Sequence, residues 1–119
     1  MKKFMLLSKE GVNMEVKVYA KGRTNNYEAY GIFDGKGLVV KKGSRVSEKI
    51  AANVNPIVLK KRKECVSSDY ITKEDVSFRS PSTAAAFVSG NVSNGFRVWK
   101  VEKSIDLGKY RENKKNGRH

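Results

Sequence analysis

The chain has 119 residues, of which 39% are hydrophobic, and this length and composition fit one domain with a modest core and exclude wholesale disorder. The single cysteine, Cys65, excludes an internal disulfide and a cysteine-based metal cluster. Twenty-five lysines and arginines oppose twelve acidic residues, which gives a formal net charge of +13.

Residues 1–13 form a short extension before the first predicted element. Their apolar run, Phe4 to Leu7, is too short for a signal peptide or a membrane span, so we expect a soluble, cytoplasmic protein. The following stretch, "MEVKVYA", alternates with period two and predicts a strand over 14–20. One face of this strand carries Met14, Val16, Val18 and Ala20, and the other carries Glu15, Lys17 and Tyr19.

The next segment predicts a β-hairpin. Residues 27–33 form one strand and residues 38–42 the other, and Gly43-Ser44 end the second strand. Between them, Asp34-Gly35-Lys36-Gly37 supply the turn, because glycine accepts a positive φ without a Cβ clash.

The middle of the chain turns helical. A short turn is expected from Ser47, and a longer helix begins with Asn55 as N-cap and Pro56 as first residue. Its apolar stripe comprises Val58, Leu59, Cys65 and Val66. Arg62 falls on the side of this stripe, so we expect its stem to be buried and its charged head to reach water. The connector "DYITKEDVSFRS" after this helix has room for a brief strand.

The stretch "SPSTAAAFVSGNVSNGFRVWK" predicts a second helix and then a turn and a strand. Ser80 caps this helix, Pro81 is its first residue, and Gly90 ends it in the left-handed conformation. Asn94-Gly95 then turn the chain into a strand, "FRVWKVE".

The resulting order is three strands, two helices and one strand. It predicts an α+β domain over 14–107, in which a small antiparallel sheet of about four strands carries two helices on one face. Residues 108–119 are polar and basic and are expected to form a flexible tail.

The sequence carries no recognisable catalytic constellation. The single histidine, His119, is the last residue, so no Ser-His-Asp or Cys-His set can form around it. The glycines of "GIFDGKG" fit a hairpin turn better than a phosphate-binding loop. We therefore expect a non-enzymatic protein without metal or cofactor.

The positive charge predicts a polyanionic partner. The basic excess lies in residues 1–50 and 77–119, whereas residues 51–76 are nearly balanced. Nucleic acid is the partner that such a charge most often serves, and an anionic membrane surface is second. The alternative is that the lysines only keep the protein soluble.

Two sequence blocks resemble the DUF4357 family, a domain of unknown function. They are "GLVVKKGSRVSEK" and "DVSFRSPSTAAAFVSGNVSNGFRVWK", and the resemblance covers roughly residues 27–110. It implies an accessory role, because such domains often follow GIY-YIG nuclease domains or accompany restriction–modification components. The Ser-Pro-Ser…Asn-Gly…Trp pattern is also similar to the RAMA domain, which is proposed to recognise modified DNA.

The candidate nucleic-acid-binding residues each have a structural alternative. They are Lys41, Lys42, Arg45, Arg79, Ser80, Ser82, Asn94, Arg97, Trp99 and Lys100. The basic residues either contact phosphate or form a solvated edge, and the two serines either hold a phosphate or only cap a helix. Asn94 has a role in the turn, and Trp99 either packs in the core or stacks on a base.

Three hypotheses follow. The first is a non-catalytic DNA-binding accessory module, and the second is a protein-interaction module that docks on a nuclease or methylase through an unpaired sheet edge. The third is a small enzyme of unrecognised type with a deep pocket.

Overall fold

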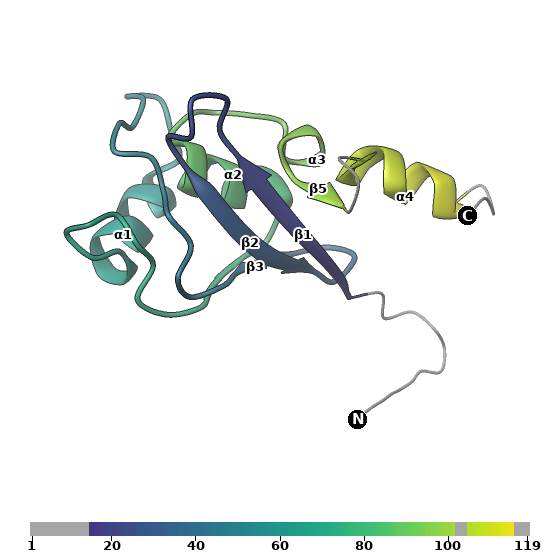
Figure 1. Ribbon diagram of the computed structural model, residues 1–119, viewed down its shortest axis with the longest axis horizontal. Helices are drawn as coiled ribbons and strands as arrows, with labels where there is room; N and C mark the ends of the chain where they lie inside the picture. Colours follow the sequence, from purple (N-terminus) through teal and green to yellow (C-terminus); the bar gives the residue numbers. More distant parts are fainter. Residues whose placement is uncertain (1–14, 102–104, 116–119) are drawn as a thin grey trace.

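The computed structural model describes residues 15–101 and 105–115 and shows an α+β fold in which an antiparallel sheet lies against helices (Figure 1). In chain order the elements are β1 (Val16–Lys21), β2 (Glu28–Phe33), β3 (Leu38–Val40), α1 (Pro56–Cys65), β4 (Val76–Phe78), α2 (Pro81–Ser89), α3 (Gly95–Val98), β5 (Lys100–Val101), β6 (Ile105–Asp106) and α4 (Leu107–Lys115). The strands form one sheet in the order β4-β3-β2-β1-β5-β6. The predicted fold class and the antiparallel sheet are confirmed.

The strand number differs from the prediction, because the sheet of the described residues has six strands and not about four. The outermost strands, β4 and β6, have three and two residues. Strands this short carry too few positions for a period-two pattern. They form because the ladder of a neighbouring strand offers their backbone groups hydrogen-bonding partners.

The predicted hairpin is present. β2 and β3 pair antiparallel over three positions, from Gly31 opposite Val40 to Phe33 opposite Leu38. In the turn between β2 and β3, the Asp34 carboxylate accepts hydrogen bonds from the backbone of Lys36 and Gly37, at 3.0 and 2.9 Å. β3 itself ends at Val40, two residues before the predicted end.

Helix α1 begins where its capping residues predict. The Asn55 side chain accepts a hydrogen bond from the Ile57 amide at 3.0 Å, and Pro56 is the first helical residue. Of the predicted apolar stripe, Val58 is fully buried, whereas Leu59 is 46% exposed. The turn expected at Ser47 is absent from this described segment, because the Ser47 amide bonds instead to the Val88 carbonyl at the end of α2.

Arg62 differs most from expectation, since its head is buried together with its stem and the whole residue is 7% exposed. Its Nε donates to the Phe87 carbonyl at 2.8 Å and its Nη1 to the Ser47 carbonyl at 2.7 Å. Carbonyl oxygens at a helix C-terminus carry partial negative charge, so the end of α2 is an electrostatic partner for the guanidinium. Burial lowers the pKa of Arg62 to about 10, which keeps the group charged at neutral pH.

Helix α2 is the centre of the molecule. Ser80 caps it through a hydrogen bond from the Thr83 amide, and Gly90 ends it at φ +79°, as predicted. Seven of its nine residues are buried, because the sheet covers one side and α1 and α3 contact others. A helix that is apolar on all sides is a buried helix. The order of layers is therefore sheet, α2 and then α1, with the other face of β1 and β2 turned toward the viewer of Figure 1.

The strand predicted after Asn94 is wrong in its first half, because residues 95–98 form the short helix α3. The Asn94 side chain accepts from the Phe96 amide at 3.0 Å, and its carbonyl accepts from the amides of Arg97 and Val98. Contact with α2 outweighs the strand propensity of these residues. Only Lys100 and Val101 pair as β5.

The segment expected as a tail from residue 108 is helical up to Lys115. Tyr110 packs against the core, and the Arg111 guanidinium lies 4.0 Å from the centre of the Phe96 ring. The expected N-terminal extension and His119 lie outside the described residues. No helix in the described ranges is both long and apolar enough to span a bilayer.

Candidate nucleic-acid interface

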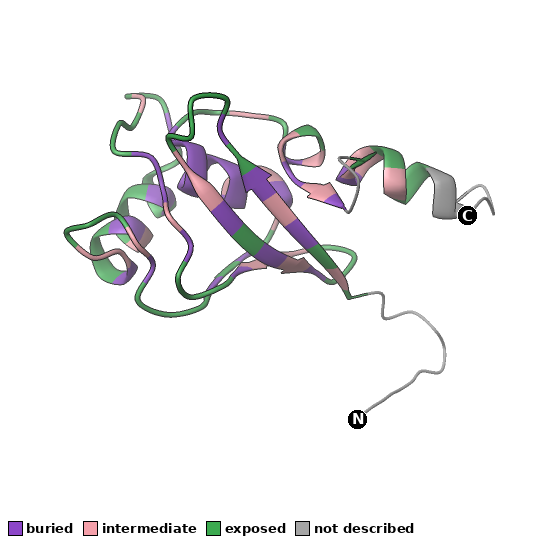
Figure 2. Cartoon of the chain, in the orientation of Figure 1, coloured by how far each residue is buried: buried purple, intermediate pink, exposed green. Residues whose placement is uncertain are grey.

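The sheet has one face that none of the helices in residues 15–101 and 105–115 covers, which we call the open face. Residues that pair directly across strands point to the same side of a sheet, and so do alternate residues along one strand. Burial follows this rule, and Figure 2 shows the alternation of buried and exposed residues along β1 and β2. The open face comprises Lys17, Tyr19, Lys21, Glu28, Tyr30, Ile32, Val39, Lys41, Arg45, Ser77, Lys100 and Asp106.

Two tyrosines lie at the middle of the open face. Tyr19 of β1 pairs directly with Tyr30 of β2 and also with Lys100 of β5. Tyr30 is 50% exposed, and its hydroxyl donates to the Glu28 carboxylate at 2.7 Å. This bond ties the ring of Tyr30 to the same strand, and it also raises the pKa of the phenol. The pairing places both tyrosines on the same side of the two central strands.

Basic residues surround this aromatic pair. Lys17 and Lys21 flank Tyr19 along β1, and both are exposed. Lys100 lies beside Tyr19 on β5, and the Lys41 amide bonds to the Tyr30 carbonyl on the other side, at 2.8 Å. The acidic residues on the same rows are Glu28, Asp75 and Asp106. Basic side chains therefore outnumber acidic ones around the tyrosines.

Lys41 and Lys42 share one acidic partner. Lys41 Nζ lies 2.9 Å from an Asp75 carboxylate oxygen, and the Lys42 amide donates to the other oxygen at 2.8 Å. The hydrogen bond from Lys41, followed by that from the Lys42 amide, lowers the pKa of Asp75. The Lys41 charge is thus partly neutralised, whereas Lys17 and Lys21 on the same face are exposed in strand β1.

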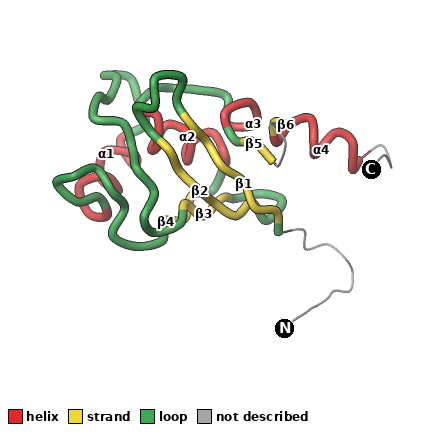
Figure 3. The backbone as a smooth tube through the Cα atoms, viewed as in Figure 1, coloured by secondary structure: helices red, strands yellow, loops and turns green. Residues whose placement is uncertain are grey.

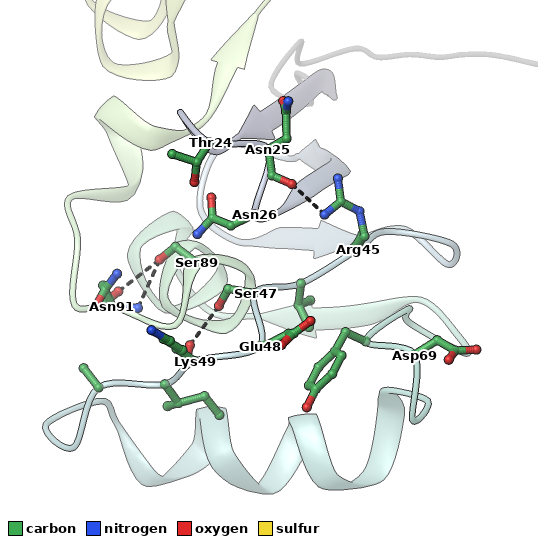
Figure 4. A pocket seen from close by; sticks show the side chains of 14 residues that line it. Thr24, Asn25, Asn26, Arg45, Ser47, Glu48, Lys49, Asp69, Ser89 and Asn91 are labelled. Carbon is green, nitrogen blue, oxygen red and sulfur yellow. Dashed lines mark hydrogen bonds between the residues drawn. The ribbon is translucent and has the colours of Figure 1, made fainter.

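An open polar pocket of about 680 Å³ adjoins the open face at Arg45 (Figure 4). The β1–β2 turn forms one side and the loop between β3 and α1, a long green segment in Figure 3, forms another. Arg45 Nη1 donates to the Asn25 carbonyl at 2.7 Å, and Ser47 Oγ donates to the Lys49 carbonyl at 2.9 Å. These bonds fix the loops that frame the pocket.

Two lining residues of this pocket, Asn25 and Tyr70, have positive φ angles of 59° and 64°. Asparagine tolerates this conformation, but tyrosine rarely adopts it. The Tyr70 carbonyl accepts from the Val46 amide and its amide donates to the Ser67 carbonyl, so two hydrogen bonds hold the strained residue. The described part of the chain contains no group of three or more His, Cys, Asp or Glu side chains that could bind a metal ion.

The Ser-Pro-Ser…Asn-Gly…Trp residues come together, but in the interior. Ser82 Oγ accepts from the Gly95 amide at 3.0 Å, and the Trp99 indole N–H donates to the Pro81 carbonyl at 3.2 Å. Gly95 packs so closely on Pro81 that an added Cβ would overlap the Pro81 carbonyl. These contacts join α2 to α3, so the motif serves the fold.

Trp99 has no exposed surface, and a base cannot stack on it without unfolding this region. Ser80 and Asn94 both act as N-caps, of α2 and α3 respectively. None of these residues belongs to the open face. We therefore leave the motif residues out of the interface proposed below.

The remaining predicted residues are dispersed. Lys41, Arg45 and Lys100 lie on the open face, and Lys42 lies next to Lys41. Arg79 directly follows β4, whereas Asp75 directly precedes it, so the two residues lie at opposite ends of this strand. Arg97 is exposed on α3, and its carbonyl accepts a hydrogen bond from Lys100 Nζ.

The candidate interface includes residues that the sequence analysis did not select. Lys17, Lys21 and the two tyrosines are the main additions. The signal for them was the strand alternation, which put Tyr19 and Lys17 on the face opposite the apolar residues. The position of Tyr30 beside Tyr19 depends on the pairing register of β1 with β2, which is known only once the two strands are paired.

A family model described as "Domain of unknown function (DUF4357)" matches residues 18–111. The chain belongs to the DUF4357 family. The DUF4357 match begins within β1 and ends within α4, so it extends the resemblance noted above toward the N-terminus to include part of β1. No curated protein and no solved structure matches the chain.

Proposed function

We propose that this protein is a non-catalytic nucleic-acid-binding module, with DNA as its partner, and that it binds through the open face. The observation that carries this proposal is the set of basic side chains around two tyrosines on a sheet face that none of the described helices covers. The net charge of +13 supports it, because such a charge attracts polyanions from solution.

The binding energy would come mainly from phosphate contacts and the release of counterions. If Lys17, Lys21, Arg45 and Lys100 each neutralise one phosphate, the logarithm of affinity falls with the logarithm of salt concentration with a slope of about −3.6 for duplex DNA and about −2.8 for a single strand. This slope is a quantitative signature of four ionic contacts.

The role within the cell is proposed from the sequence resemblance. Domains that resemble this one often accompany nuclease or restriction–modification components, so we propose a cytoplasmic accessory role beside a nuclease or methylase. DNA binding would hold such a partner near its substrate. To test whether the protein recognises modified DNA, its affinity for an adenine-methylated probe is compared with its affinity for an unmodified one.

Fluorescence anisotropy with a labelled DNA probe over a salt series tests the proposal. The test variant is Lys17→Glu/Lys21→Glu, which reverses two exposed charges on the open face. The matched control is Lys60→Glu/Lys63→Glu, which makes the same charge change on two exposed positions of α1. We expect the first variant to lose most of the affinity and the control to keep most of it.

Equal losses in both variants would show that binding depends on overall charge and not on the open face. Absence of binding at low salt would refute the proposal and favour the protein-interaction hypothesis. The described sheet offers little for strand addition, because its edge strands β4 and β6 have only three and two residues. A protein partner would therefore have to use side-chain contacts.

A further inference from the structure

We infer that the open face selects single-stranded nucleic acid over duplex, by stacking bases on Tyr19 and Tyr30. This inference rests on the proposed nucleic-acid function and specifies the form of the ligand. It starts from the position of the two tyrosines, which are cross-strand partners near the middle of a six-stranded sheet.

The shape of the open face argues against a duplex as the preferred ligand. The major groove admits an α-helix or a two-stranded ribbon, and the described sheet is wider than that. Within a duplex, moreover, each base is covered by its neighbours, so an aromatic side chain has no base surface to stack on. Only unpaired bases offer that surface.

The chemistry of the open face matches a single strand in two respects. Directly paired residues on neighbouring strands have Cβ atoms about 5 Å apart, so Tyr19 and Tyr30 together offer a surface of two neighbouring aromatic side chains. The apolar side chains of Ile32 and Val39, which pair with each other on the next row, extend it. Lys17, Lys21 and Lys100 lie around this surface, where they can contact the phosphates of a strand whose bases are stacked.

The hydrogen bond between the Tyr30 hydroxyl and Glu28 contributes to this arrangement. It restricts rotation of the half-exposed ring before any ligand binds, so less conformational entropy is lost on stacking.

The experiment compares three labelled probes of one sequence, about 15 nucleotides long: single-stranded DNA, the corresponding DNA duplex and single-stranded RNA. Wild-type protein should bind single-stranded DNA at least about fivefold more tightly than duplex, which corresponds to the low end of the energy of one stacked base. Tighter binding of the RNA probe would support selection of a single strand, but it would refute DNA as the partner in the proposed function and replace it by RNA.

Variants test whether the tyrosines cause this preference. Tyr19→Leu/Tyr30→Leu should weaken single-strand binding by about 5- to 150-fold per stacked base, with the salt slope unchanged because the lysines remain. Tyr19→Phe/Tyr30→Phe keeps both rings and should retain most of the affinity. Tyr70→Leu removes a comparably exposed tyrosine outside the open face and serves as the control.

The possible failures are distinct. If wild-type protein binds duplex as tightly as single strand, the inference is overturned while the proposed function stands. If the leucine variant binds single strand like the wild type, stacking is likewise refuted. If neither form binds at low salt, both proposals fail. If the leucine variant does not fold, the affinities of wild-type protein for single strand and for duplex still test whether the open face selects a single strand.

Discussion

Replacement of Arg62 by methionine should destabilise the protein strongly, even though this residue is one of twenty-five basic residues. Methionine keeps an unbranched apolar stem and removes only the guanidinium. In the wild type this group donates to the carbonyls of Ser47 and Phe87 at 2.7 and 2.8 Å and to the Ser47 hydroxyl at 3.0 Å. These acceptors would remain buried without that donor.

A hydrogen bond from a charged donor contributes about 1.5–3 kcal/mol, and an unsatisfied buried acceptor costs a similar amount. Loss of the two shortest bonds therefore predicts a decrease of about 3–6 kcal/mol in the free energy of unfolding. This is a large part of the total of about 5–15 kcal/mol that is typical of a domain. With an m-value of about 1.5 kcal/mol per molar, the urea midpoint should fall by about 2 M or more.

Urea denaturation followed by the fluorescence of Trp99 measures this change, because Trp99 is the single tryptophan and is fully buried. Lys63→Met is the control, since Lys63 lies next to Arg62 on α1 but is exposed, and its replacement should change stability by less than about 0.5 kcal/mol. Arg62→Lys should recover only a small part, because an ammonium group cannot reproduce the fork of donors. A loss below about 1 kcal/mol in Arg62→Met would refute the assigned role.

Two further predictions concern other sites. Gly95→Ala should destabilise the protein by about 1–3 kcal/mol or prevent folding, because the new methyl group overlaps the Pro81 backbone. Gly108→Ala is the control in the same urea assay. It should cost much less stability, because the atoms nearest to the added Cβ are 3.2 Å away or more. The hydrogen bond from Lys41 lowers the pKa of Asp75 in the folded state below the ordinary value of 3.8. The carboxylate therefore stabilises the fold above pH 3.8, and this contribution is lost as the pH falls through the folded-state pKa. The difference in urea midpoint between wild type and Asp75→Asn should therefore be present at pH 6 and shrink below pH 3.8, and a difference that grows in acid would contradict the assignment.

The sequence was sufficient wherever local chemistry decides the structure. Asn55-Pro56 and Ser80-Pro81 start their helices at the predicted residues, and Gly90 ends α2 in the left-handed conformation. The hairpin turn at Asp34 also forms as predicted. In each case a side chain or a glycine meets a backbone requirement within three residues of itself, so the signal is contained in a short stretch.

Tertiary structure decided the features that depend on distant partners. Gly95 to Val98 form a helix and not a strand because Gly95 packs on Pro81, and Arg62 is buried because its guanidinium donates to carbonyls at the end of α2. Trp99 is core because its indole reaches the Pro81 carbonyl.

The candidate interface shows the same division. Strand alternation in the sequence determined that Tyr19 and Lys17 lie opposite the core. The strand pairing then decided which other residues join them. Pairing of β1 with β2 and β5 adds Tyr30 and Lys100, and pairing of β2 with β3 adds Lys41. These pairings bring together residues up to 81 positions apart in the sequence. Pairing register depends on which strands meet across the whole fold, and no single stretch of sequence contains that information.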